Sequence, residues 1–255
     1  MDDPAKFPLA VLAVCFLAMW LSARIGLLFR KRQPNLEEAK SQDLDLIVTV
    51  TLTLLGLIIG FSFSMAINRY DQRKIYEEAE ANAIGTEYVR ADLLPAAEAT
   101  RVRALLKDYL DQRILFYRTR DEHELLQIDA RTTQLQAELW SAIKAPDTAQ
   151  QTPVLALVVS GMNDVLNSQG YTQAAWWNRI PTGAWLLMLA IAIYSNLLVG
   201  YGGHHAEAGV IRSLVLPIVL CLAFFAIADI DSPRRGTIRV QPQNLISLAQ
   251  SLQGR

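Results

Sequence analysis

The sequence lacks the residues and spacings on which most enzymatic sites are built. It has 2 cysteines and 3 histidines among 255 residues, and it contains no glycine-rich phosphate loop, CxxC, HExxH, GxSxG or dinucleotide-binding fingerprint. Its net charge is -1, and its basic residues do not cluster with aromatics in a binding stripe, so nothing indicates a nucleic-acid partner. No segment alternates like a β-strand. We therefore expect an all-α protein that is not an enzyme, needs no cofactor and binds no nucleic acid.

Apolar residues, in contrast, are abundant and come in long runs. They make up 52% of the chain, which exceeds the usual share in a soluble domain. A helix needs about 20 apolar residues to cross a hydrocarbon core of ~30 Å. Both cysteines, Cys15 and Cys221, lie in such runs and are interpreted as small apolar residues. The predicted transmembrane helices cover residues 8–29, 44–67, 182–201 and 209–230.

The remaining segments are more polar and helical in pattern. Between the second and third spans, residues 68–180 place apolar side chains at helical spacing in three stretches. The tail, 231–255, ends in a short amphipathic helix marked by Leu245, Leu248 and Leu252. We predict an all-α integral membrane protein with four transmembrane helices and a helical domain inserted between spans two and three.

An even number of spans puts both termini and the inserted domain on one side of the membrane. Basic residues near the span ends are more numerous on that side, although Arg30, Lys31 and Arg32 form a dense cluster on the other. The positive-inside rule therefore favours cytoplasmic termini and a cytoplasmic helical domain.

The second span organises the chain, because its helix has no proline before Pro95 and is predicted to continue into water. Arg73 with Glu77, and Lys74 with Glu78, are one turn apart and can pair along a helix face. Within the span, two rows repeat every four residues. One is a small-residue face suited to close helix packing, and the other lies about 100° round the helix. The rows are Gly56, Gly60 and Ser64, and Thr53, Leu57 and Phe61.

Periodicity by itself favours two ordinary packing surfaces. In a symmetric oligomer, however, one row could face a neighbouring helix and the other a central axis.

Polar residues flank this span at both ends. Asp43 and Asp45 are expected to open the helix. In an oligomer, a ring of these carboxylates would concentrate cations at a pore mouth. The simpler interpretation is that an aspartate at a helix N-terminus caps the helix. The cluster at the membrane exit could anchor the helix at the interface or join neighbouring subunits. Its members are Asn68, Arg69, Tyr70, Asp71 and Arg73.

A third polar group lies in the link between spans three and four. His204, His205 and Glu207 have side chains that bind divalent ions, but such a trio more often decorates a polar loop. We therefore predict no metal site.

Two segments carry a resemblance to a known family. GFSFSMAINRYDQRK, residues 60–74, resembles the bestrophin signature, and EEAEANAIGTEYVRADLLP, residues 77–95, resembles bacterial membrane proteins with a bestrophin-like domain. The resemblance implies a homo-oligomeric, pentameric ion channel of a bacterial inner membrane, whose partners are lipid and inorganic ions.

The resemblance also implies roles for single residues. It places Phe61, Leu57 and Thr53 at an apolar neck, which can close a pore by dewetting. Animal bestrophins bind calcium at an acidic segment matching Asp229 and Asp231, but here Arg234 follows, which argues against calcium gating. The alternative is a non-conducting membrane scaffold or regulator whose cytoplasmic helices bind a partner.

Overall fold

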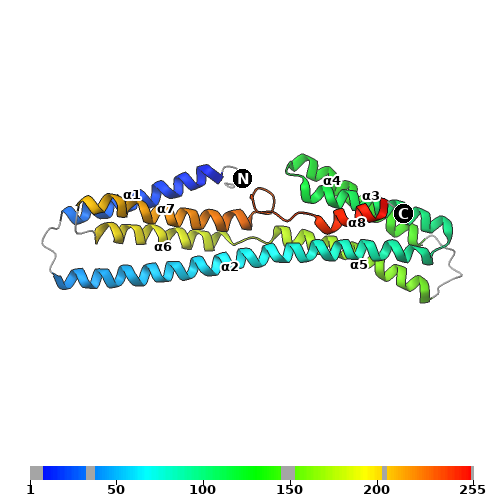
Figure 1. The fold of residues 1–255 in the computed structure, drawn as a ribbon, viewed down its shortest axis with the longest axis horizontal. Coiled ribbons are helices and arrows are strands. Elements are labelled where there is room, and N and C mark those ends of the chain that lie inside the picture. Colours follow the sequence, from blue (N-terminus) through cyan, green and yellow to red (C-terminus); the bar gives the residue numbers. More distant parts are fainter. Residues whose placement is uncertain (1–7, 33–37, 145–152, 203–205, 254–255) are drawn as a thin grey trace. The chain divides into compact units, whose positions relative to one another are not determined.

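The structure, a computed structural model, describes residues 8–32, 38–144, 153–202 and 206–253, with the helix ends 8–11, 38–42 and 206–213 described by backbone alone. No strand occurs in these residues, which confirms the predicted all-α class. Four helices are long and apolar enough to cross a membrane. In chain order (Figure 1), the elements are α1 Pro8–Lys31, α2 Glu38–Arg90, the short 3₁₀ helix η2 Ala91–Leu93, α3 Ala96–Arg118, α4 Glu122–Lys144, α5 Pro153–Trp177, α6 Thr182–Tyr201, α7 Ala206–Asp231 and α8 Gln243–Gln253.

The chain divides into two compact units, and α2 belongs to both. Unit 1 comprises Met1–Ile67 and Ile180–Asp231, and unit 2 comprises Asn68–Arg179 and Ser232–Arg255. The 53 residues of α2 would extend about 80 Å at 1.5 Å per residue, far more than a bilayer core requires. The boundary at Ile67 coincides with the end of its apolar stretch. The charged half of α2 therefore lies outside the membrane-spanning stretch. Which side of the membrane unit 2 occupies stays a prediction.

Unit 1 is held together by close packing of α1 on α6. A Cβ atom added to Gly26 would overlap the carbonyl oxygen of Leu197, and one added to Gly200 would overlap that of Ala23. The Ser22 hydroxyl donates a hydrogen bond of 2.7 Å to the Ile193 carbonyl. Such contacts are typical of membrane helices, which associate through small residues that let backbones approach. A buried cluster joins four helices: Met19, Leu55, Met188, Ala192, Leu220 and Phe224.

Unit 2 packs the second half of α2 with α3, α4, α5 and α8 around one apolar core. α8 is the short amphipathic helix predicted from Leu245, Leu248 and Leu252, and it confirms that prediction. The most deeply buried apolar residues include Ile84, Val102, Leu106, Leu135, Leu139, Met162 and Leu245.

Charged side chains bind the free backbone groups at both ends of α8. The Glu77 carboxylate accepts hydrogen bonds from the Leu245 N–H (3.0 Å) and the Asn244 amide (2.6 Å) at the start of α8. At the other end of α8, Lys107 donates to the Leu252 carbonyl (2.8 Å). A carboxylate at the N-terminus and an ammonium at the C-terminus both match the helix dipole. These contacts fix α8 in unit 2.

Candidate pore lining on the second membrane helix

The predicted neck row lies on a face of α2 that the rest of the protomer does not cover. Leu57 is 54% exposed and Phe61 63% exposed, and Thr53 is exposed as well. The helix instead turns Leu55, Ser62 and Ala66 inward, which are all buried. The row is thus available either to a central axis or to lipid, and its role as a neck stays a prediction.

The threonine in this row presents less polarity than its hydroxyl suggests. The Oγ1 atom of Thr53 donates a hydrogen bond of 2.8 Å to the Thr49 carbonyl one turn earlier. Thr49 and Thr51 make the same bond, to Asp45 and Ile47. Because threonine in a helix commonly bonds back to the preceding turn, its donor is satisfied and its methyl group is left for packing. Thr53 is therefore compatible with an apolar ring.

The small-residue row meets no neighbour within the described part of the protomer. A Cβ atom at Gly56 or Gly60 would have nothing within 4 Å, and Ser64 is exposed. The close glycine packing of this chain lies on α1 and α6 instead, at Gly26 and Gly200. Packing through Gly56, Gly60 and Ser64 stays a prediction that concerns only contacts with another chain.

The two acids at the start of the span do not cap the helix. α2 begins at Glu38, five residues before Asp43, so the expectation that these aspartates open the helix is wrong. The helix therefore begins six residues before the predicted span, which starts at residue 44. Asp43 and Asp45 are both exposed. Their role at a pore mouth stays a prediction.

The membrane-exit cluster divides into exposed and buried members. Asn68 and Asp71 are exposed, and Tyr70 packs against the core of unit 2. Arg73 is almost completely buried, and its guanidinium donates to the carbonyl oxygens of Ala175 (3.2 Å) and Asn178 (3.3 Å). These carbonyls lie at the C-terminal end of α5, where a cation suits the helix dipole. Arg73 therefore joins α2 to α5 within the protomer.

Charged side chains form a buried seam on α2 that sequence reasoning missed. The buried positions follow one another at steps of four, three, four, three and four residues, the heptad spacing of packed helices. Four of the six are ionisable residues, so the composition of the segment resembles that of a solvent-exposed helix face. The regular spacing, with Ile84 and Ala91 in the same row, is the signal that could have identified it. The seam is Arg73, Glu77, Glu80, Ile84, Glu87 and Ala91.

The centre of the seam is an ion pair between Glu80 and Arg113 of α3, both without exposed surface. Glu80 also accepts hydrogen bonds from Thr172 (3.1 Å) and Tyr117 (3.4 Å). Burial by itself would lower the pKa of the Arg113 guanidinium, but the adjacent Glu80 charge raises it above its ordinary value. Burial, reinforced by Glu80, raises the pKa of the Tyr117 hydroxyl. The pair is therefore a fixed link between α2, α3 and α5.

The segment after the last span also has structural roles. Asp231 accepts a hydrogen bond of 3.0 Å from the Ile180 N–H, just before α6 begins. Arg234 donates to the Phe116 carbonyl (2.8 Å) and lies 4.4 Å from the centroid of the Trp176 ring, within cation–π range. Burial lowers the pKa of Arg234 to about 10. Arg234 is therefore held against Phe116 and Trp176 in unit 2.

The remaining metal candidates receive no support. His204 and His205 lie outside the described residues, as does the side chain of Glu207. Among the residues that the structure describes, no three histidine, cysteine or acidic side chains gather closely enough to hold a metal ion.

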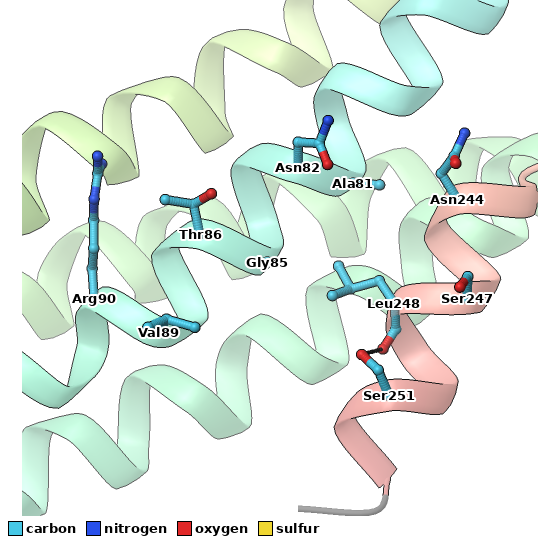
Figure 2. A pocket seen from close by; sticks show the side chains of 10 residues that line it. All are labelled: Ala81, Asn82, Gly85, Thr86, Val89, Arg90, Asn244, Ser247, Leu248 and Ser251. Carbon is cyan, nitrogen blue, oxygen red and sulfur yellow. Dashed lines mark hydrogen bonds between the residues drawn. The ribbon is translucent and has the colours of Figure 1, made fainter.

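Unit 2 also carries an open groove of about 650 Å³ between α2 and α8. Figure 2 shows Leu248 reaching from α8 towards α2 near Gly85, with Asn82 and Thr86 on α2 and Ser247 and Ser251 on α8. A Cβ atom on Gly85 would lie 3.1 Å from the Leu248 side chain, so Gly85 lets α8 approach. The groove is an open surface feature of mixed polar and apolar lining rather than an enclosed site.

Comparison with known proteins identifies the family and the fold of this chain. The model of the Bestrophin-like domain matches residues 9–245. No curated protein matches the chain. Several solved structures share its fold at low sequence identity.

A structure of a bacterial bestrophin homologue from Klebsiella pneumoniae is 13% identical, with a TM-score of 0.64 over 93% of this chain and 98% of that chain. A point variant of the Klebsiella homologue is also 13% identical, with a TM-score of 0.66 over 95% of this chain and 98% of that chain. A variant described only as a membrane protein is 14% identical, with a TM-score of 0.67 over 96% of this chain and 98% of that chain. Because the family model covers most of the chain, this protein belongs to the bestrophin-like family and has the fold of bacterial bestrophins.

Proposed function

We propose that this protein is a homo-oligomeric ion channel of a bacterial inner membrane, with an apolar neck formed by Thr53, Leu57 and Phe61 of α2. The known members of its family and fold are ion channels rather than enzymes. The oligomer is a pentamer by resemblance, and unit 2 and both termini lie in the cytoplasm.

The poor coverage of α2 by its own protomer carries this proposal. In its most apolar stretch only 11% of residues are buried, against 33% for the stretches in Pro153–Tyr201 and Leu214–Asp231. A helix that lines a central axis and contacts two neighbouring subunits keeps most of its circumference free within its own chain. The uncovered side of α2 includes the apolar row and, one residue over, the small residues that permit close approach of another helix.

The chemistry of the row fits a gate that closes by dewetting. Leucine and phenylalanine give an ion no polar group to replace its hydration shell, and Thr53 has its donor satisfied by the helix. A ring of such side chains excludes water when narrow and conducts when it widens. Asp43 and Asp45, at the other end of the stretch, would collect cations before the neck.

Single-channel recording in planar bilayers tests the proposal. Purified wild-type protein would be compared with Phe61→Ala under a sodium chloride gradient. We expect larger or more frequent currents from Phe61→Ala, because the smaller side chain widens and wets the neck. The reversal potential would give the cation or anion preference.

Phe63→Ala is the matched control. Phe63 is 39% exposed on the same helix but lies outside the row, so its truncation should leave the currents unchanged. Equal effects of both variants would refute the assignment of the neck. Silence from wild type and Phe61→Ala, with the oligomer verified by native mass spectrometry, would refute the channel.

That silent outcome would favour a non-conducting scaffold or regulator. The open groove between α2 and α8 is the feature of unit 2 that suits a binding partner. The channel function would therefore depend on the membrane-spanning part of α2, and the scaffold function on the part of α2 that lies in unit 2.

A further inference from the structure

One acid of the buried seam has no hydrogen-bonding partner. Glu87 has no exposed surface, and neither of its carboxylate oxygens accepts a hydrogen bond from any residue that the structure describes. Glu77 and Glu80, on the same side of α2, are both hydrogen-bonded. A buried carboxylate without such partners is costly in its charged form and much less so when protonated.

The carboxyl group lies directly against the backbone of α5. A Cβ atom added to Gly161 would overlap Glu87 Oε2 and Arg90 Nη1, so glycine lets both side chains lie in their observed positions against α5. Arg90 reaches past this point and donates a long hydrogen bond of 3.4 Å to the Leu157 carbonyl. Glu87 is therefore part of the contact through which α2 and α5 pack.

The charges around Glu87 come from each neighbouring element. Arg90 on α2 favours its ionised form, and Asp164 on α5 disfavours it. On the α3 side, Arg103 and Lys107 lie against the ring of Tyr88, and Arg103 pairs with Asp92 of η2. Burial is the largest influence and raises the pKa of Glu87 to about 8. The side chain is thus neutral at pH 7 when α2 and α5 are packed.

We propose that Glu87 is a proton-operated contact: its neutral form lets α5 pack on α2 at Gly161, and loss of its proton separates the two helices there. The inference goes beyond the channel function, because it concerns the packing of unit 2. Since α2 also carries the proposed neck, this contact would couple pH to the pore helix.

The direction of the pH effect follows from linkage. In the separated state Glu87 returns to its ordinary pKa of 4.5, whereas in the packed state its pKa is about 8. Below the lower value both states are protonated and the balance does not change with pH. Between the two values the packed state holds one more proton, so packing weakens about tenfold for each pH unit. Above about pH 8 the dependence ends.

Hydrogen–deuterium exchange of the full chain in detergent micelles tests the proposal. Protection factors would be measured for the amides of α5 around Gly161, from about pH 5 to about pH 9, after correction for intrinsic exchange rates. In the wild type we expect protection to fall about tenfold per pH unit up to about pH 8. In Glu87→Gln, which cannot ionise, protection should not change with pH. The exposed Glu78→Gln should behave as the wild type does.

Parallel pH dependence in the wild type and Glu87→Gln would overturn the proposal. A second measurement serves if Glu87→Gln does not fold. Infrared spectroscopy of the wild type should show a protonated carboxyl band near neutral pH that disappears around pH 8. Absence of that band at neutral pH would equally overturn the proposal. Neither readout requires current, so a silent protein with pH-dependent exchange would refute the channel and leave Glu87 in this role.

Discussion

Arg113 of α3 and Glu80 of α2 form an ion pair in which neither side chain has exposed surface. Replacing one partner leaves the other as an uncompensated buried charge, which typically costs about 3–5 kcal/mol. We expect Arg113→Leu to lower the stability of unit 2 by that amount, measured as a lower melting temperature in detergent.

The matched control is Arg131→Leu in α4. The Arg131 guanidinium is 40% exposed and lies 3.6 Å from Glu138, so its loss should cost about 1 kcal/mol or less. Equal melting temperatures for Arg113→Leu and the wild type would show that the buried pair does not stabilise unit 2.

A second prediction concerns Arg73 and the stability of the C-terminal end of α5. Arg73→Ala removes the buried donors from the carbonyl oxygens of Ala175 and Asn178, and hydrogen bonds to charged groups contribute about 1.5–3 kcal/mol each. We expect the last turn of α5 to exchange its amide hydrogens faster. Lys74→Ala, at the next and exposed position, should leave that exchange unchanged. Unaltered protection in Arg73→Ala would contradict a capping role.

Gly200 tests the contact between α1 and α6. Gly200→Ala places a methyl group on the Ala23 carbonyl and must separate the helices, with a cost of about 1–3 kcal/mol. Gly183→Ala is the control on the same helix, because a Cβ atom there has nothing within 4 Å. Its effect should stay within ~1 kcal/mol. Thermal unfolding in detergent measures both, and equal melting temperatures would argue against tight packing at Gly200.

Gly60 tests the contact between subunits. Within the described protomer Gly60 is exposed and a Cβ atom there has nothing within 4 Å, so Gly60→Leu should leave the monomer fold intact. If the small-residue row faces another subunit, the leucine blocks its close approach. We expect native mass spectrometry to show smaller assemblies, with circular dichroism unchanged. A fully assembled Gly60→Leu oligomer would exclude this row from the interface.

The two acids before the neck make an electrostatic prediction. Replacing Asp43 and Asp45 together by asparagine should lower the ratio of cation to anion permeability, because a ring of carboxylates attracts cations. The change should shrink in high salt, since the Debye length falls from ~30 Å at 0.01 M to ~3 Å at 1 M. Reversal potentials at both salt concentrations measure this. A ratio that does not change would remove these residues from the conduction path.

The sequence predicted the apolar part of this fold well and the charged part poorly. Apolar runs of about 20 residues identify membrane helices by length alone. The burial of Arg73, Glu77 and Glu80 depends on partners about 30 to more than 160 residues away along the chain, and no local window contains both members of such a pair. Within the predicted site, the four-residue spacing identified Thr53, Leu57 and Phe61 as one exposed row of α2. The role of that row depends on contacts with other subunits, which a single chain does not contain.

The capping of α8 by Glu77 and Lys107 has a consequence for how the protein is made. The residues that Glu77 binds, Asn244 and Leu245, are translated after the stretches of all four candidate membrane helices. The core of unit 2 therefore stays incomplete until α6 and α7 have been translated, although α3, α4 and α5 precede them. A variant truncated before α8 would keep all four candidate membrane helices but would leave Glu77 and Lys107 without the partners that α8 supplies.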